Sequence, residues 1–115
     1  MAEKNYAQQR ASVLEKLDGL RVEVDAEKRI GYLILDRAPL NIVSYTGRHQ
    51  IRAIIEEMDE DPDVGVIVIK GANGVYTSGG DVKAFPDIPK NKMSDLHWNI
   101  GAPERCEKPV ICAVE

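Results

Sequence analysis

The chain of 115 residues has room for one small domain with a single hydrophobic core. Hydrophobic residues make up 43% and charged residues 30% of it, the ordinary balance of a soluble globular protein. The net charge of -4 gives no support to a nucleic-acid partner, because such proteins usually present a basic face.

The two cysteines indicate neither a metal site nor a disulfide framework. Cys106 and Cys112 are six residues apart, without CxxC spacing or a nearby pair of histidines. The first residues lack the apolar core of a secretory signal, and no apolar stretch approaches membrane-spanning length. We therefore expect a cytoplasmic protein that binds no metal ion and no membrane.

The N-terminal region reads as an arm followed by a hairpin. Residues 1–19 are mostly polar with a few apolar residues at helical spacing, so we expect a short amphipathic helix or a mobile arm. Leu20 to Asp25 alternates between apolar and polar residues, the pattern of a half-buried strand. A turn at 26–28 joins it to a second strand over Arg29 to Leu35.

A loop and a helix come next. Pro39 lacks a backbone donor and biases the preceding residue towards extended geometry, so residues 36–41 are expected to form the loop. The next helix is expected to begin with Ser44 or Thr46 as its cap and to run to about Glu60. Its apolar residues Ile51, Ile54, Ile55 and Met58 follow helical spacing.

In the second half of the chain, the sequence predicts a strand, a glycine turn, helical segments and a last strand, in this order. Val64 to Ile69 is a continuous apolar run, typical of a strand covered on both faces. A short helix is expected to begin after the glycine turn at 78–80, and Ser94 is the candidate cap of a later helix that breaks near Gly101. Residues 108–114 form the last strand, and its position at the end of the chain suggests truncation.

The glycine turn that follows the apolar strand is the feature most suggestive of function. Ser78, Gly79 and Gly80 precede the polar residues Asp81 and Lys83. Glycine permits backbone conformations in which N–H groups point into a cleft and approach a ligand closely. The alternative is a tight connection that binds nothing, with Asp81 capping a helix and Ser78 serving as a structural hydroxyl.

Several short motifs follow one another in a fixed order: Leu35-Asp36-Arg37, Pro39-Leu40-Asn41, Asp61-Pro62-Asp63-Val64, Val66-Ile67-Val68-Ile69-Lys70-Gly71, Ser78-Gly79-Gly80-Asp81-Val82-Lys83 and Lys108-Pro109-Val110-Ile111. In this order they resemble the crotonase superfamily, which includes enoyl-CoA hydratases and isomerases, and the resemblance covers residues 20–115. It implies an α/β fold, the N-terminal half of a crotonase-like spiral of ββα units, with residues 20–115 forming that part of the domain.

The resemblance also implies a function and a set of site residues. Gly80 would donate its backbone N–H to a thioester oxygen as half of an oxyanion hole. The positions implied to bind coenzyme A are Arg37, Pro39, Leu40, Asn41, Ser78, Gly79, Gly80, Asp81, Val82 and Lys83. The substrate would be an acyl-CoA thioester, coenzyme A would enter only as part of it, and no separate cofactor is expected.

The family's second oxyanion donor and its acid/base carboxylates would lie beyond Glu115. We therefore expect the 115-residue chain alone to be inactive, and the full-length parent to form trimers or hexamers. The alternative is a non-catalytic crotonase-like binding or assembly module. A nucleotide-binding α/β domain is disfavoured, because the turn lacks both the GxGxxG and the GxxxxGK[ST] spacing.

Overall fold

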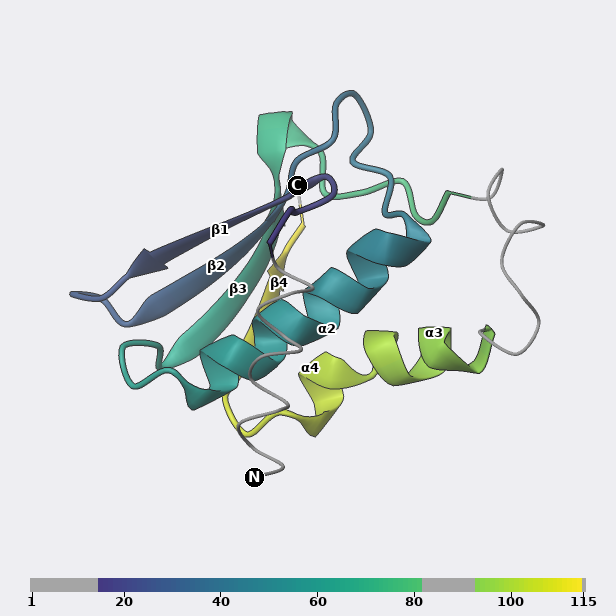
Figure 1. Cartoon of the computed structure of the whole chain (residues 1–115). Coiled ribbons are helices and arrows are strands. Elements are labelled where there is room, and N and C mark those ends of the chain that lie inside the picture. The colour runs from purple at the N-terminus through teal and green to yellow at the C-terminus, as the bar shows by residue number, and fades with distance from the viewer. Residues whose placement is uncertain (1–14, 82–92, 115) are drawn as a thin grey trace.

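The computed structural model describes the chain over residues 15–81 and 93–114. Its centre is one four-stranded sheet, drawn as arrows in Figure 1. β1 runs antiparallel to β2, and β3 and β4 then add in parallel on the other side of β2. The strands are β1 (Leu20–Asp25), β2 (Ile30–Leu35), β3 (Val66–Gly71) and β4 (Val110–Ala113).

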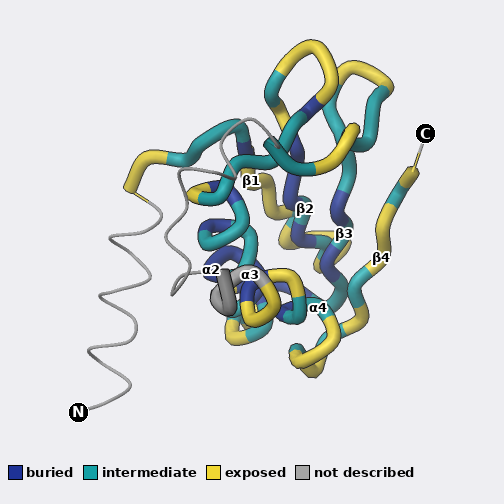
Figure 2. The backbone as a smooth tube through the Cα atoms, turned by 90° about the vertical axis from the view of Figure 1, so that its right-hand side faces the viewer, coloured by how far each residue is buried: buried dark blue, intermediate teal, exposed yellow. Residues whose placement is uncertain are grey.

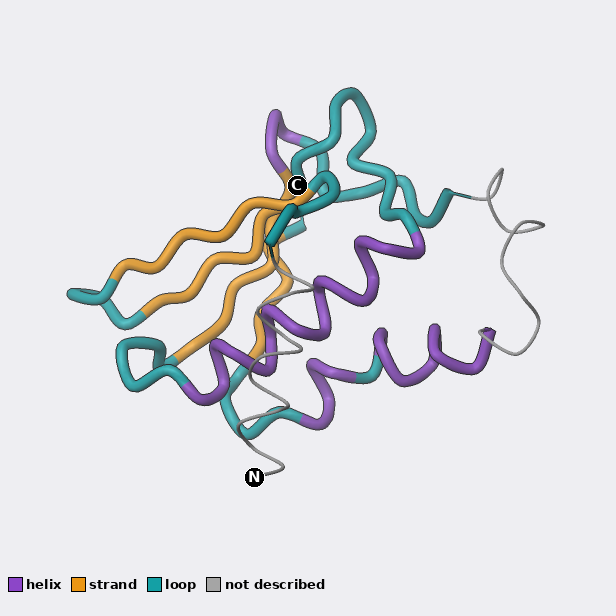
Figure 3. Tube along the Cα trace, viewed as in Figure 1, coloured by secondary structure: helices purple, strands orange, loops and turns teal. Residues whose placement is uncertain are grey.

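All of the described α-helices lie on one face of this sheet (Figure 3). They are α2 (Tyr45–Glu60), α3 (Met93–Ile100) and α4 (Ala102–Arg105), and a single 3₁₀ turn, η1 (Ala72–Gly74), follows β3. Helix α2 crosses from β2 to β3, and the α3–α4 pair crosses from β3 to β4. This order of elements confirms the α/β class and the ββα unit expected from the sequence. None of the described helices has the length and apolar composition needed to cross a membrane.

The core lies between the sheet and α2 (Figure 2). Leu33 and Leu35 of β2 face the same side as Ile67 and Ile69 of β3, because neighbouring strands are paired in register and alternate residues share a face. Helix α2 supplies the opposing layer from its apolar stripe, so the helical spacing of its isoleucines and Met58 is confirmed. The buried cluster consists of Leu20, Leu33, Leu35, Ile54, Ile55, Met58, Val64, Ile67, Ile69 and Ala102.

The opposite face of the sheet differs from the sequence expectation. A continuous apolar run predicted a strand covered on both faces, yet in the described residues β3 alternates between buried and half-buried side chains. Ile111 on the same outer face of β4 is 54% exposed. Within the parts of the chain that the structure describes, no helix packs against this face.

Both ends of α2 are capped. Ser44 is the N-cap, since its Oγ accepts a hydrogen bond from the Gly47 N–H at 2.9 Å, so Ser44 rather than Thr46 fills the expected role. At the other end, the Lys108 ammonium donates to the carbonyl oxygens of Met58 and Asp61, both at 2.6 Å. Each of these carbonyls also accepts a backbone N–H, and the cation adds a favourable charge at the negative end of the helix.

Several element boundaries differ from expectation. The strand predicted to start at Val64 starts at Val66, because the N–H groups of Gly65 and Val66 bond to the Arg29 carbonyl at the hairpin turn. Helix α3 begins at Met93, so Ser94 lies inside it rather than before it. The predicted break is present at Gly101. The N-terminal segment 1–14 and the helix and loop expected over 82–92 lie outside the described residues.

Candidate functional site

The loops that follow β2 and β3 meet at one edge of the sheet. Residues 36–44 follow β2 and residues 72–81 follow β3, and Figure 1 shows both loops gathered at the same end of the molecule. Because these two strands are parallel, their carboxyl ends lie side by side, which is where open α/β sheets hold their ligands.

Asn41 ties the two loops together. Its side-chain Oδ1 accepts from the Arg37 N–H at 2.8 Å, and its Nδ2 donates to the carbonyls of Ala72 and Val75 at 3.1 and 2.7 Å. The side chain is buried, and the backbone φ of 53° is one that asparagine tolerates better than most residues. The resemblance implied that Asn41 contacts coenzyme A, and that contact stays a prediction. In the structure the Asn41 side chain is used to join the two loops.

The glycine turn pairs with Val43 through backbone hydrogen bonds. The Val43 N–H donates to the Gly79 carbonyl at 2.9 Å, and the Asp81 N–H donates to the Val43 carbonyl at 3.1 Å. In this parallel bridge of Val43 with Gly80, both ladder bonds use the neighbours of Gly80. The N–H and C=O of Gly80 itself therefore point away from Val43, and among the described residues the Gly80 N–H has no hydrogen-bond partner. Gly79, with φ of 111°, takes the left-handed geometry that makes this path possible.

A pocket of about 260 Å³ lies beside this turn. Its walls come from the sheet edge, the first turns of α2, the glycine turn and the α3–α4 junction, and most of them are apolar. It is lined by Leu35, Val43, Arg48, Ile51, Ile69, Tyr76, Thr77, Gly79, Gly80, Asn99, Ile100 and Pro103. A mostly apolar hollow with a few polar groups is the usual form of a small-molecule site.

The polar groups in the walls have distinct protonation behaviour. Burial raises the pKa of Tyr76 to about 12, with the neighbouring Cys112 thiol adding to the rise. Tyr76 is therefore a neutral phenol at physiological pH, able to donate a hydrogen bond and unsuited to act as a base. Thr77 is engaged in the loop, where its Oγ1 donates to the Asn41 carbonyl at 2.6 Å and accepts from the Gly79 N–H at 3.1 Å.

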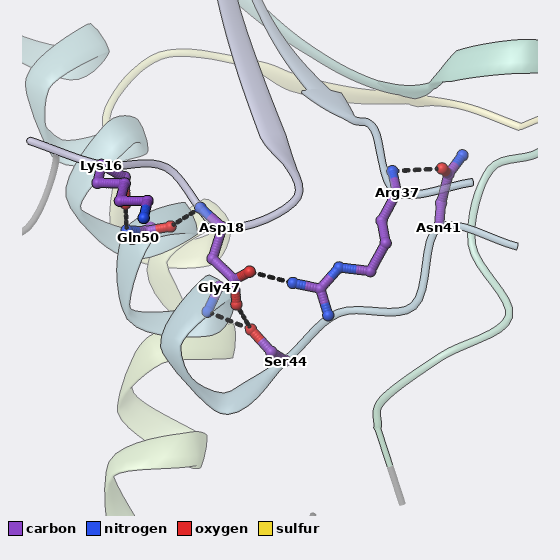
Figure 4. A network of polar contacts seen from close by, with 7 residues as sticks. All are labelled: Lys16, Asp18, Arg37, Asn41, Ser44, Gly47 and Gln50. Atoms are coloured by element: carbon purple, nitrogen blue, oxygen red, sulfur yellow. Dashed lines mark hydrogen bonds and ion pairs between the residues drawn. The ribbon is translucent and has the colours of Figure 1, made fainter. Parts of the chain in front are cut away.

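Arg37 is held in a polar network with Asp18 and Ser44 (Figure 4). Its guanidinium pairs with the Asp18 carboxylate, which also accepts a hydrogen bond from the Ser44 hydroxyl. The Ser44 hydrogen bond, with Arg37 beside it, holds the pKa of Asp18 below its usual value, and burial only partly opposes that shift. The Arg37 cation, which the resemblance placed among the residues that bind coenzyme A, is thus paired within the protein, and the pairing reduces the charge that it offers to a ligand.

The remaining predicted site residues vary in exposure. Pro39, Leu40 and Ser78 are exposed on the two loops, and the Ser78 N–H donates to the Leu40 carbonyl at 3.0 Å. Asp81 is half-buried at the end of the turn. Val82 and Lys83 lie outside the described residues, so their predicted contacts stay predictions.

Sequence reasoning identified Gly79 and Gly80 of this pocket and missed its other residues, among them Val43, Arg48 and Asn99. Val43 supplies the edge to which the turn binds, and Arg48 brings a cation from the first turn of α2. The helical period would have placed Arg48 one turn after the cap, but nothing in the sequence brings Asn99 to the carboxyl ends of the strands.

A larger hollow of about 510 Å³ lies between β1 and α2. Its walls contain Glu57, Glu60 and Asp61, which would repel an anionic ligand, and the glycine turn is remote from it. We therefore place the site in the smaller pocket. Among the described residues, no group of His, Cys, Asp and Glu side chains is arranged to hold a metal ion.

No protein-family model matches the chain, but individual relatives do. It is 30% identical over 66 residues to a Mycobacterium tuberculosis protein named as a probable enoyl-CoA hydratase, covering 56% of this chain and 26% of that one. It is 37% identical over 104 residues to the mitochondrial 3-hydroxyisobutyryl-CoA hydrolase of Rattus norvegicus, covering 81% of this chain and 27% of that one.

Solved structures show the same fold. An enoyl-CoA hydratase/isomerase family protein from Hyphomonas neptunium matches with a TM-score of 0.72 at 26% identity, over 85% of this chain and 40% of that one. An enoyl-CoA hydratase/isomerase from Xanthobacter autotrophicus matches with a TM-score of 0.76 at 19% identity, over 87% and 39%. The chain thus spans about a quarter of these curated relatives and two fifths of these structures.

Proposed function

Since the chain matches part of the enoyl-CoA hydratase/isomerase (crotonase) family in sequence and in fold, we propose that its parent protein acts on an acyl-CoA thioester. The thioester carbonyl is polarised in an oxyanion hole. The hole stabilises the enolate that forms when the α-carbon loses a proton or when water adds to the β-carbon of an enoyl group, and protonation of that enolate completes the reaction. Gly80 supplies one donor of that hole.

One observation supports this proposal above the others. The Gly80 N–H is left out of the ladder with Val43, and Gly80 lies in the wall of an apolar pocket at the carboxyl ends of β2 and β3. A backbone donor in such a site costs no reorganisation when charge develops on a bound oxygen, and it strengthens as water is excluded. A donor of this kind contributes on the order of 3 kcal/mol to stabilising a transition state.

The surrounding residues fit an acyl group better than a polar substrate. Leu35, Ile51 and Ile69 provide apolar walls, so the acyl chain would lie against the sheet edge and α2. The described residues that line the pocket include no Asp or Glu, and we therefore propose that the 115-residue chain alone turns over little or no substrate.

Coenzyme A would run along the loops 37–41 and 78–83. Because Arg37 is paired with Asp18, Lys83 becomes the cation of greater interest for the phosphates. We expect Lys83→Glu to weaken coenzyme A binding by charge reversal, and an unchanged dissociation constant would remove Lys83 from the proposal.

The test is a calorimetric titration of the protein expressed from its complete reading frame. Butyryl-CoA and free coenzyme A are the two probes, and the 115-residue chain is titrated in parallel. We expect binding of both ligands, tighter for butyryl-CoA because its chain enters the pocket. Absence of butyryl-CoA binding to the complete protein would contradict the proposed function.

A second candidate is a non-catalytic binding or assembly module. The observation that favours it is the outer face of the sheet, where Ile111 of β4 is 54% exposed among the described residues. Exposed apolar side chains on a flat strand favour association with another surface. Sedimentation of the chain and of its Ile111→Lys variant would separate the candidates: an oligomer that Ile111→Lys dissociates, with no acyl-CoA binding, favours the module.

A further inference from the structure

Asn99 on α3 carries a buried donor with no partner. The residue is 1% exposed, and its Nδ2 makes no hydrogen bond within the described structure. Leaving a buried amide N–H₂ unpaired is costly, so such groups in folded proteins call for an explanation. The Oδ1 atom of the same carboxamide does have a partner, so only the Nδ2 group needs an explanation.

Arg52 fixes which end of the carboxamide is the donor. The Arg52 Nε donates to the Asn99 Oδ1 at 2.8 Å, and only the oxygen can accept that bond. The Arg52 guanidinium is itself held by Glu56, with 3.0 Å between Arg52 Nη1 and Glu56 Oε2. Because a cation bonded to the carbonyl oxygen polarises the amide, the N–H₂ group of Asn99 is a stronger donor than an isolated carboxamide.

The residue that carries the unpaired amide lies at the candidate active site. Asn99 lines the same 260 Å³ pocket as Gly80, in the wall formed by the α3–α4 junction. The other walls are largely aliphatic and come from residues such as Leu35 and Ile51. A saturated acyl chain would pack against these walls and would leave Asn99 Nδ2 without a hydrogen-bond partner.

We propose that Asn99 selects acyl groups that carry a hydrogen-bond acceptor, such as a ketone or hydroxyl oxygen, along the chain. This inference rests on the proposed acyl-CoA function and names its substrate class. A site that hydrogen-bonds a ligand oxygen rejects the analogue that lacks it, because the buried donor is then left without a partner. One such bond corresponds to about a tenfold difference in affinity.

The test compares matched ligand pairs on the protein expressed from its complete reading frame. Butyryl-CoA is set against 3-oxobutyryl-CoA, and hexanoyl-CoA against 5-oxohexanoyl-CoA, so that the oxygen is placed at two depths. We expect about a tenfold tighter dissociation constant for the oxo ligand in at least one pair. In Asn99→Asp that preference should disappear, since an aspartate still accepts from Arg52 and has no N–H₂ to donate.

Asn99→Asp is the informative variant because it keeps the Arg52 contact and the side-chain volume. A second measurement needs no substitution: the side-chain ¹⁵N–¹H₂ signals of Asn99 should shift with the oxo ligand and much less with its alkyl partner. Binding with no preference in either pair, or a preference that Asn99→Asp retains, would overturn this inference alone. Failure of every acyl-CoA to bind would overturn the proposed function and the inference with it.

Discussion

The Asn41 carboxamide donates to the Val75 carbonyl at 2.7 Å and so joins the loop after β2 to the loop after β3. This contact spans 34 residues of sequence, and it joins the loop that pairs with the glycine turn to the loop that contains it. The position of Gly80 therefore depends on a buried side chain that touches neither the turn's N–H groups nor the pocket.

We expect Asn41→Ala to destabilise the protein by about 3 kcal/mol, because it leaves the Arg37 N–H and the Val75 carbonyl without this partner and removes one of the two hydrogen bonds to the Ala72 carbonyl. Urea unfolding measures the change. The matched control is Asn73→Ala: Asn73 also has a positive φ, 60°, but its side chain is exposed. Equal losses in the two variants would mean that backbone strain, rather than the hydrogen bonds, accounts for the effect.

Gly71 is the point at which β3 must turn sharply into the site loop. A Cβ added at Gly71 would lie 1.6 Å from the Val75 carbonyl oxygen, so Gly71→Ala forces the backbone of the loop to move. We expect a loss of about 3 kcal/mol or more in stability together with loss of ligand binding. Gly74→Ala is the comparison, since φ there is 76° but no atom lies within 4 Å of the added Cβ. We expect about 1 kcal/mol from that strain alone, and a Gly71→Ala protein as stable as Gly74→Ala would contradict the clash.

Asp18 makes the free energy of unfolding depend on pH. Its pKa is lowered in the folded state by Ser44 and Arg37, so its contribution is present above the ordinary value of 3.8 and is lost as the pH falls through the folded pKa. We expect Asp18→Asn to cost about 1 kcal/mol at pH 7, as for a partly exposed ion pair, and progressively less in acid. Thermal unfolding from pH 7 to pH 2 measures this, with the exposed Asp63→Asn as control. A difference between wild type and Asp18→Asn that stays constant down to pH 2 would contradict the assignment.

Local sequence signals predicted much of the fold. The alternation over Leu20–Asp25 and the helical stripe ending at Glu60 depend on neighbours a few residues apart, and both elements have the expected bounds at those residues. Ser44 was one of two predicted caps, because capping is local chemistry, and the structure selects it over Thr46. The start of β3 was misplaced by two residues, because the Arg29 carbonyl that binds Gly65 and Val66 comes from a distant turn.

The sequence indicated the candidate site only at its glycine turn. Gly79 and Gly80 were identified from the turn itself, and the ladder with Val43 explains why the Gly80 N–H remains available. The pairing of Arg37 with Asp18 and the arrival of Asn99 in the pocket depend on tertiary packing across many residues. No local periodicity encodes such contacts. For this reason sequence patterns assigned Arg37 to coenzyme A binding and did not indicate Asn99.

The central claim is that the Gly80 N–H polarises a thioester carbonyl. The most direct measurement is the infrared carbonyl stretch of an acyl-CoA labelled with ¹³C at the thioester carbon, bound to the complete protein. Because a hydrogen bond to the carbonyl weakens its double bond, we expect the band to move to lower frequency on binding to wild type. The shift should persist in Gly80→Ala, which keeps the N–H, and be clearly smaller in Gly80→Pro, which removes one of the two donors. A shift of the same size in bound Gly80→Pro would contradict the account.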